Sequence, residues 1–286
     1  MPPIPAAAPD IPAPDAPAPD APAPDIPAPG TSGPQPTRQP ARRPTPRLGP
    51  AYRFVAAVGG LACRLAGRPD WRGTEHFPRQ GGYITAVNHN SVFDPFVYGY
   101  FQYRTGLPPR FLIKSSLFTR PLVGPLLRAA GQIPVERASS RAAQALDGAR
   151  EALARGECVA IYPEGTLTRD PDLWPGPGKT GAARLALMTR APVVPVAQWG
   201  AHRVVPPYGL GGRRVRLRPR PTFVVAVGPP VDLSDLYDLE PTAAVLHEAS
   251  ARIMAAITAV LEDIRGERHP GHPGGAGTPA ARPLAS

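Results

Sequence analysis

Short apolar runs alternate with helix-like stretches through the middle of this chain, and this alternation most constrains its fold. The runs Tyr83 to Val87, Cys158 to Ile161 and Val193 to Ala197 are mainly apolar, as strands buried on both faces are. A helical pattern from Lys179 to Arg190 separates the last two. Because strands alternate with helices, the sequence predicts an α/β fold in which helices cover a sheet.

Further elements are expected on either side of these runs. They are a helix capped by Ser139 or Ser140 and ended at Gly156, a hairpin of Val215 to Arg218 with Thr222 to Val227, and an amphipathic helix from about Thr242 to Ile264.

The first 47 residues differ from the rest. Of the 286 residues, 43 are proline, and residues 6–30 repeat Asp-Ile/Ala-Pro-Ala-Pro every five positions. This period cannot bury a hydrophobic face and favours extended polyproline II. We therefore expect residues 1–47, which end in a basic linker, and the Gly-, Pro- and His-rich tail 266–286 to be disordered. One folded domain, 48–265, remains.

Charge indicates a polyanionic partner. All 32 lysines and arginines follow residue 37, together with 18 of the 22 acidic residues, so that part of the chain carries a net charge of +14. Such a charge favours either nucleic acid or an anionic membrane surface. Aromatic and basic residues do not alternate as in a known nucleic-acid module, and the two cysteines do not have zinc-finger spacing. Membrane is therefore the favoured partner.

A helix from Tyr52 to Ala66 would suit that partner. Four apolar residues fall within about 60° of one another on a helical wheel, namely Phe54, Val58, Leu61 and Leu65. Ten residues separate Arg53 from Arg64, fewer than the roughly 20 that a transmembrane helix needs. The pattern predicts a helix lying in the membrane interface, with burial against the protein's own core as the alternative.

The loop Asn88 to Asp94 places a histidine and a carboxylate five positions apart, directly after the first apolar run. On a continuous helix, five residues rotate by about 140°, so His89 and Asp94 meet only if a helix begins near Asp94. Pro95 suits a first helical position and Asp94 an N-cap. Imidazole titrates near neutrality and a carboxylate fixes its tautomer, so the pair is a candidate general base with its partner. The alternative is a structural cap beside an ordinary loop histidine.

Three more segments follow this loop in order: Gly131 to Arg137, Tyr162-Pro163-Glu164-Gly165-Thr166, and Val193 to Ala197. Together with the loop they resemble the four sequence blocks of the 1-acylglycerol-3-phosphate acyltransferase family. The resemblance covers about Tyr83 to Gly200. It implies a mixed sheet with the site at one edge. It also implies transfer of a fatty acyl group from acyl-CoA or acyl carrier protein to lysophosphatidic acid, giving phosphatidic acid in phospholipid biosynthesis.

The resemblance also implies substrate-binding roles for six residues. Arg137 is the candidate phosphate clamp, because a guanidinium holds phosphate oxygens bidentately. The others lie where relatives line the acceptor site or carry a lysine, with a surface role as the alternative for both lysines; they are Lys114, Glu164, Gly165, Thr166 and Lys179.

One position departs from the family pattern. The family commonly has an arginine after the threonine of the third block, where this chain has Leu167, with Arg169 two positions further.

The chemistry needs no further group. A thioester is already an activated acyl donor, so we expect direct transfer without a serine or cysteine nucleophile, metal or bound cofactor. The chain has no G-x-S-x-G elbow. Two alternatives stay open: the same chemistry on glycerol 3-phosphate or another lysophospholipid, or a non-catalytic basic protein that binds membrane or nucleic acid.

The expected location is the cytoplasmic face of the cell membrane. Two cysteines far apart in sequence, Cys63 and Cys158, give no disulfide framework. The first residues lack the basic start and apolar core of a secretory signal. We therefore expect a peripheral membrane enzyme.

Overall fold

The computed structural model describes residues 48–106, 108–135, 142–207 and 215–271. The proline repeat, the basic linker and most of the tail lie outside the described residues. The helices and 3-10 turns are α1 (Pro50–Ala66), η1 (Thr74–His76), α2 (Asp94–Arg104), η2 (Ser115–Leu117), α3 (Val123–Ala129), α4 (Ala142–Ala154), α5 (Gly181–Thr189), α6 (Ala201–Val204), η3 (Ser234–Leu236) and α7 (Ala243–Arg265).

Seven strands form one sheet in the order β1-β7-β6-β2-β5-β3-β4. They are β1 (Arg68–Arg72), β2 (Tyr83–Val87), β3 (Pro109–Lys114), β4 (Ile133–Val135), β5 (Cys158–Ile161), β6 (Val193–Trp199) and β7 (Thr222–Val227). Neighbouring strands are parallel except β6 and β7, which are antiparallel. The mixed sheet and the α/β class expected from the sequence are therefore confirmed.

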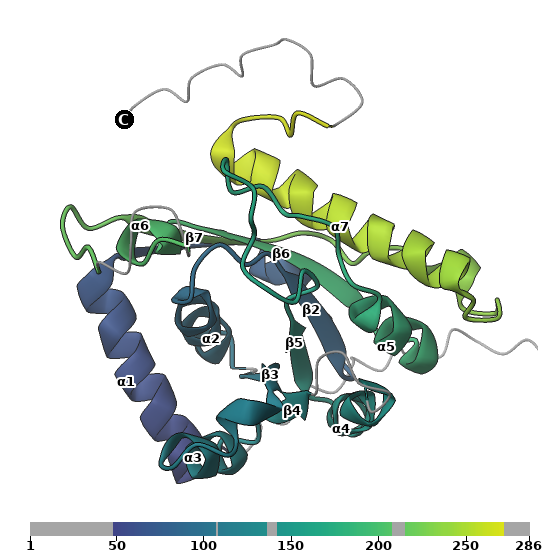
Figure 1. Cartoon of the computed structure of the whole chain (residues 1–286), viewed down its shortest axis with the longest axis horizontal. Coiled ribbons are helices and arrows are strands. Elements are labelled where there is room, and N and C mark those ends of the chain that lie inside the picture. Colours follow the sequence, from purple (N-terminus) through teal and green to yellow (C-terminus); the bar gives the residue numbers. More distant parts are fainter. Residues whose placement is uncertain (1–47, 107, 136–141, 208–214, 272–286) are drawn as a thin grey trace, which may run out of the picture. The chain divides into compact units, whose positions relative to one another are not determined.

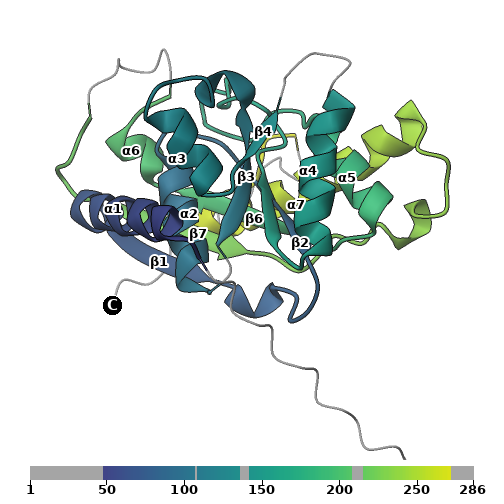
Figure 2. The ribbon, with the colours of Figure 1, turned by 90° about the horizontal axis from the view of Figure 1, so that it is seen from below.

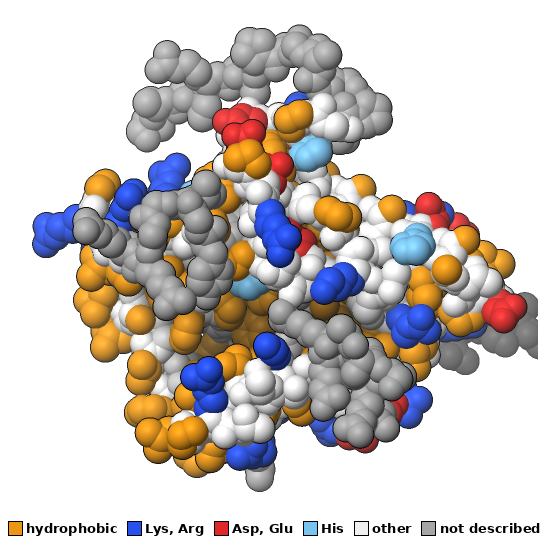
Figure 3. Space-filling model, in the orientation of Figure 1, with side chains coloured by type: hydrophobic (Ala, Val, Ile, Leu, Met, Phe, Trp, Pro, Cys, Tyr) orange, Lys and Arg blue, Asp and Glu red, His pale blue; other side chains and the backbone are white. Residues whose placement is uncertain are grey.

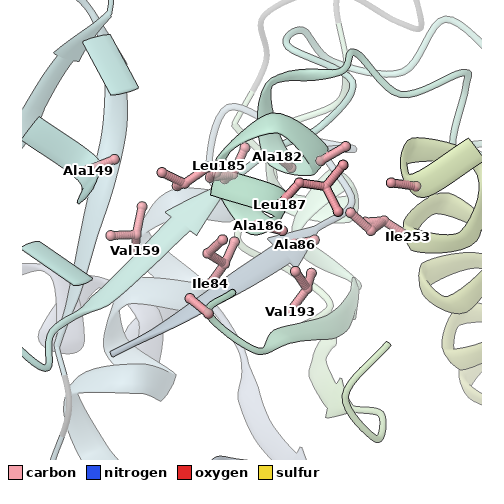
Figure 4. Packing of buried hydrophobic residues seen from close by; sticks show 14 of the residues in the cluster. Ile84, Ala86, Ala149, Val159, Ala182, Leu185, Ala186, Leu187, Val193 and Ile253 are labelled. Atoms are coloured by element: carbon pink, nitrogen blue, oxygen red, sulfur yellow. The ribbon is translucent and has the colours of Figure 1, made fainter. Parts of the chain in front are cut away.

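Helices cover both faces of this sheet (Figures 1 and 2). On one face, α4, α5 and α7 pack over the centre of the sheet through apolar side chains such as Leu185 and Ile253, which meet Ile84 and Val193 (Figure 4). On the other face, α1 and α2 pack over a second cluster that includes Phe101. Side chains alternate between the two faces of a strand, so strands covered on both faces are apolar throughout, as the runs in the sequence are.

The hairpin expected at Val215 to Arg218 is wrong. Thr222 to Val227 does form a strand, β7, but its two neighbours in the sheet are β1 and β6. Val215 to Leu217 has no regular structure and is exposed. Alternating apolar and charged residues mimic a half-buried strand, but both edges of β7 are already paired, so no place is left for a hairpin partner.

Helix α1 buries one side and exposes the other. Tyr52, Cys63 and Ala66 are buried. The apolar stripe faces outward, with exposed fractions of 62% for Phe54, 54% for Val58, 53% for Leu61 and 66% for Leu65. Burial of this stripe in the protein's own core, the alternative considered from the sequence, is therefore wrong.

Helix α7 is the one helix of the described residues that is long and apolar enough to cross a membrane. It lies over the sheet, and Leu246, Ile253, Ile257 and Leu261 on its inner side are buried. Thr242 caps its first turn by accepting the backbone N–H of Val245 at 3.4 Å. In this structure α7 is a core helix.

Candidate active site

The carboxyl ends of five parallel strands meet at one edge of the sheet. β2, β3, β4, β5 and β6 run in the same direction, so the loops that follow them leave on the same side, where α/β proteins place ligands. His89 comes two residues after β2, Glu164 three residues after β5, and Lys114 ends β3. The topology thus gathers the described site candidates at this edge.

His89 and Asp94 face each other across the loop between β2 and α2. Nδ1 of His89 lies 3.0 Å from Oδ2 of Asp94, and their side chains are 17% and 1% exposed. The same oxygen accepts the backbone N–H groups of Asn90 at 2.6 Å and Ser91 at 2.7 Å. Because an ionised carboxylate only accepts, the ring proton lies on Nδ1 and Nε2 is left as an acceptor.

Asp94 accepts hydrogen bonds from the preceding loop and does not cap the helix. Burial raises the pKa of Asp94, and the hydrogen bonds from His89, Ser91 and Asn90 oppose that rise. As expected, α2 begins here, with Pro95 in its first turn. The expected N-cap role of Asp94 is wrong, because the N-cap residue is Phe93 and no side chain caps this helix end. The carboxylate is used by the preceding loop instead.

Glu164, which follows the neighbouring strand β5, holds the His89 loop through a hydrogen bond. Its Oε1 accepts the backbone N–H of His89 at 3.0 Å, and its Oε2 accepts that of Gly176 at 3.1 Å. Burial raises the pKa of Glu164 to about 7, and these two N–H groups oppose the rise. A further bond, from the N–H of Thr168 to the carbonyl of His89 at 2.8 Å, ties the same two loops together.

The turn after Glu164 carries Gly165 and an exposed Thr166. Gly165 has φ 70°, a left-handed conformation that favours glycine. The side chain of Lys179 lies over this turn, since a Cβ on Gly165 would come within 3.0 Å of its Nζ. The N–H of Lys179 also donates to the carbonyl of Pro163 at 2.8 Å. Lys179 therefore belongs to the same site as the turn.

The departure from the family pattern has a structural counterpart. Leu167 is 9% exposed and so packs inward, whereas Arg169 is exposed. Lys114 ends β3, is exposed, and lies opposite Val135, the last residue of β4. Arg137, two positions after Val135, lies outside the described residues, so its clamp role stays a prediction.

Sequence reasoning missed Tyr162 and the pair formed by Asn88 and Gln198. The ring of Tyr162 stacks on that of His89, with centroids 4.2 Å apart and planes at 23°. Asn88 Oδ1 accepts the N–H of Gln198 at 2.7 Å, and the Gln198 side-chain amide donates to the Asn88 carbonyl at 3.0 Å. The available signal was that Tyr162 opens the third block, directly after a strand, β5, that pairs with β2.

The loop offers a base and no activated nucleophile. The hydroxyl of Ser91 donates to the carbonyl of Val205 at 2.7 Å, and the side chains of Cys63 and Cys158 are buried. Among the described residues, no three His, Cys, Asp or Glu side chains gather into a group able to hold a metal ion. An oriented imidazole with a free Nε2 can take a proton from a hydroxyl group.

Residues 68–199 match the family model "Acyltransferase". Three proteins named 1-acyl-sn-glycerol-3-phosphate acyltransferase are among the similar sequences. The Limnanthes douglasii protein is 30% identical over 66% of this chain and 63% of its own length. The chloroplastic Brassica napus protein BAT2 is 30% identical over 49% and 39%, and the Bacillus subtilis (strain 168) protein is 29% identical over 52% and 71%.

The chain thus spans less than two thirds of the plant relatives' length. Among solved structures, the 1-acyl-sn-glycerophosphate acyltransferase PlsC from Thermotoga maritima superposes with a TM-score of 0.56. Its sequence is 23% identical, and the match covers 76% of this chain and 81% of that one. It shares the fold. These matches confirm the resemblance that the four sequence blocks indicate.

Proposed function

We propose that this chain, in which residues 68–199 match the Acyltransferase family model, moves a fatty acyl group from a thioester to the free hydroxyl of lysophosphatidic acid, giving phosphatidic acid. The observation that carries the proposal is the 3.0 Å contact between Nδ1 of His89 and Asp94. It leaves Nε2 as a base at the edge of the sheet where the carboxyl ends of the parallel strands meet. This edge is called the ligand edge below. A protein that only binds anionic surfaces has no need of an oriented imidazole.

The proposed reaction is a direct transfer. Nε2 of His89 accepts the proton of the acceptor hydroxyl while that oxygen attacks the thioester carbonyl. A C–O bond forms, the C–S bond breaks, and the proton passes from Nε2 to the leaving thiolate. Asp94 stabilises the imidazolium between these two proton transfers. Because the thioester is already activated, we propose no metal and no bound cofactor; the donor is acyl-CoA or acyl carrier protein.

Lysines at the ligand edge would bind the acceptor's phosphate. Lys179 lies over the turn at Gly165, and Lys114 ends the neighbouring strand β3. Both are exposed, so each can reach a ligand without a cost for burying its charge. Arg137 is proposed as the bidentate clamp, and Thr166 as a contact to the glycerol part of the acceptor.

We further propose peripheral attachment to an anionic membrane at its cytoplasmic face. Phe54, Val58, Leu61 and Leu65 form one apolar stripe, each more than half exposed. In Figure 3, hydrophobic side chains fill the margin of the molecule where α1 and α3 lie. Covering four half-exposed apolar side chains is worth about 3–6 kcal/mol. Arg53 and Arg64, exposed on the same helix, suit anionic head groups.

A different acceptor is the second candidate, because Leu167 stands where the family commonly has an arginine. The same chemistry would then act on glycerol 3-phosphate or another lysophospholipid. The buried Leu167 offers no charge, so head-group recognition would rest on Lys179, Arg137 and Arg169 instead. This alternative keeps the roles of His89 and Asp94 unchanged.

An acyl-transfer assay tests the proposal. Full-length protein is mixed with acyl-CoA or acyl carrier protein donors and a panel of lysophosphatidic acid, glycerol 3-phosphate, lysophosphatidylcholine and lysophosphatidylglycerol. We expect ester product with lysophosphatidic acid at a higher kcat/KM than with the others. A higher value for another acceptor would establish the second candidate. No product from any donor and acceptor pair by folded protein would overturn the enzyme assignment.

A further inference from the structure

The ring of Tyr162 stacks on two other rings at the edge of the sheet where the site lies. One face stacks on His89, with centroids 4.2 Å apart. The ring of Tyr162 also stacks on that of Phe111 of β3, with centroids 6.2 Å apart and planes at 6°. Phe111 pairs with Ala160, and Tyr162 lies two residues further on the same side of its chain. The sheet itself therefore fixes where the Tyr162 ring lies.

The hydroxyl of Tyr162 does not explain this placement. Neither that hydroxyl nor the side-chain oxygen of nearby Gln198 has a hydrogen-bond partner among the described residues. Burial raises the pKa of Tyr162 well above its ordinary value, the charge of Asp94 adds to the rise, and the neighbouring side chain of Gln198 opposes it. The hydroxyl is therefore neutral at physiological pH, and the contacts of Tyr162 with His89 and Phe111 are made by its ring.

The imidazole of His89 is incompletely held without this ring. Asp94 fixes one ring atom, Nδ1, and Glu164 and Thr168 hold only the backbone of His89. A single hydrogen bond lets an imidazole tilt about the line joining the two partners. A flat aromatic surface against the ring removes that tilt, and its negative face also favours a cationic imidazolium.

We propose that Tyr162 is a positioning residue for His89: its ring holds the imidazole in the plane in which Nδ1 meets Asp94 and Nε2 points to the acceptor hydroxyl. This inference rests on the proposed function and adds a residue to it. The aromatic ring is the required part of the side chain, and the hydroxyl is dispensable.

The test compares Tyr162→Leu with Tyr162→Phe in the full chain. Tyr162→Leu is expected to lower kcat about 10-fold with acceptor and donor KM values within about 2-fold, because the ring acts on the base rather than on binding. Tyr162→Phe keeps the stack and should restore most of that loss. If Tyr162→Leu is unstable, Tyr162→Met takes its place, because methionine has a volume similar to that of leucine.

Phe77→Leu is the matched control. Phe77 is partly buried against the same apolar cluster as Tyr162, where its ring makes tilted contacts with the rings of Tyr83 and Phe101. Its loss should lower the thermal midpoint about as much as Tyr162→Leu does while leaving kcat nearly unchanged. A fall in kcat for Phe77→Leu as large as for Tyr162→Leu would reduce Tyr162 to a general packing role and overturn the inference.

A second readout needs no activity. The Hε1 proton of His89 is identified in the NMR spectrum by its disappearance in His89→Ala. Loss of the stacked ring in Tyr162→Leu should shift this signal downfield, and Tyr162→Phe should leave it in place. An inactive wild-type protein with these shifts would contradict the proposed function alone. An active wild type whose kcat and His89 signal are the same in Tyr162→Leu would contradict this inference alone.

Discussion

Oδ2 of Asp94 lies 3.0 Å from Nδ1 of His89 and, in the same loop, accepts two backbone N–H groups. In Asp94→Asn, the side-chain oxygen can replace Oδ2 and keep all three bonds, but the negative charge is lost. The imidazolium formed during transfer is then unsupported. We expect kcat to fall about 10² to 10⁴-fold with little change in acceptor KM. Steady-state kinetics of the folded variant check this, and an unchanged kcat would remove Asp94 from the mechanism.

The acceptor-binding cations should affect KM instead. Lys179→Ala and Arg137→Ala each remove a charge that would bind phosphate equally in the ground and transition states, so acceptor KM should rise about 10-fold with kcat nearly constant. The control is Arg184→Ala, an exposed cation on α5 one turn beyond Lys179. A similar KM rise in the control would point to a general charge effect.

Glu164 predicts a specific pH dependence of stability. Its pKa is about 7 in the folded protein against an ordinary value of 4.5. Between these two values the folded state binds more protons than the unfolded state, so this group's contribution to the free energy of unfolding falls as pH rises. Glu164→Gln cannot ionise. The free energy of unfolding of wild type minus that of Glu164→Gln should therefore decrease from pH 4.5 to 7, as denaturant titrations at several pH values would measure. A flat difference would contradict the assigned pKa.

The apolar stripe of α1 predicts a separation of membrane binding from folding. Replacing Phe54, Val58 and Leu61 by serine should weaken vesicle binding and leave the thermal midpoint nearly unchanged, because each side chain is more than half exposed. Met188→Ser with Leu239→Ser is the control, since both residues are exposed apolar side chains outside α1. Unfolding of the triple variant would contradict the interfacial role.

Charge on the same helix should act only on anionic membranes. Neutralising Arg53 and Arg64 should weaken binding to anionic vesicles at low salt and have little effect on neutral vesicles or at high salt. Vesicle sedimentation at two salt concentrations measures this. Equal loss on neutral vesicles would mean that these arginines do not act through charge.

The sequence predicted the central strands and the contact between His89 and Asp94 because their signals are local. Strands covered on both faces are continuous apolar runs, and His89 and Asp94 lie five positions apart in one loop. Val215 to Arg218 carries an equally local pattern, but the hairpin strand predicted from it is wrong. The neighbours of β7 in the sheet are β1 and β6. Nothing in that short segment reports this pairing.

The supporting contacts of the site are distant in sequence and so were not predictable. Glu164 bonds the backbone of His89 across 75 positions, and Gln198 bonds Asn88 across 110. The stack of Tyr162 on His89 depends on β2 and β5 being neighbours in register. The resemblance named Glu164 as an acceptor-site residue; its bond to the His89 backbone is visible only in the fold.

The most direct test of the account is the activity of His89→Ala. The side chain is 17% exposed and the loop backbone is held by Glu164 and Thr168, so the variant should fold and bind lipid as the wild type does. Without the base, kcat for acyl transfer should fall by at least about 10² to 10⁴-fold. A folded His89→Ala protein that transfers acyl groups at a near-normal rate would contradict the assignment of His89 as the general base and the mechanism built on it.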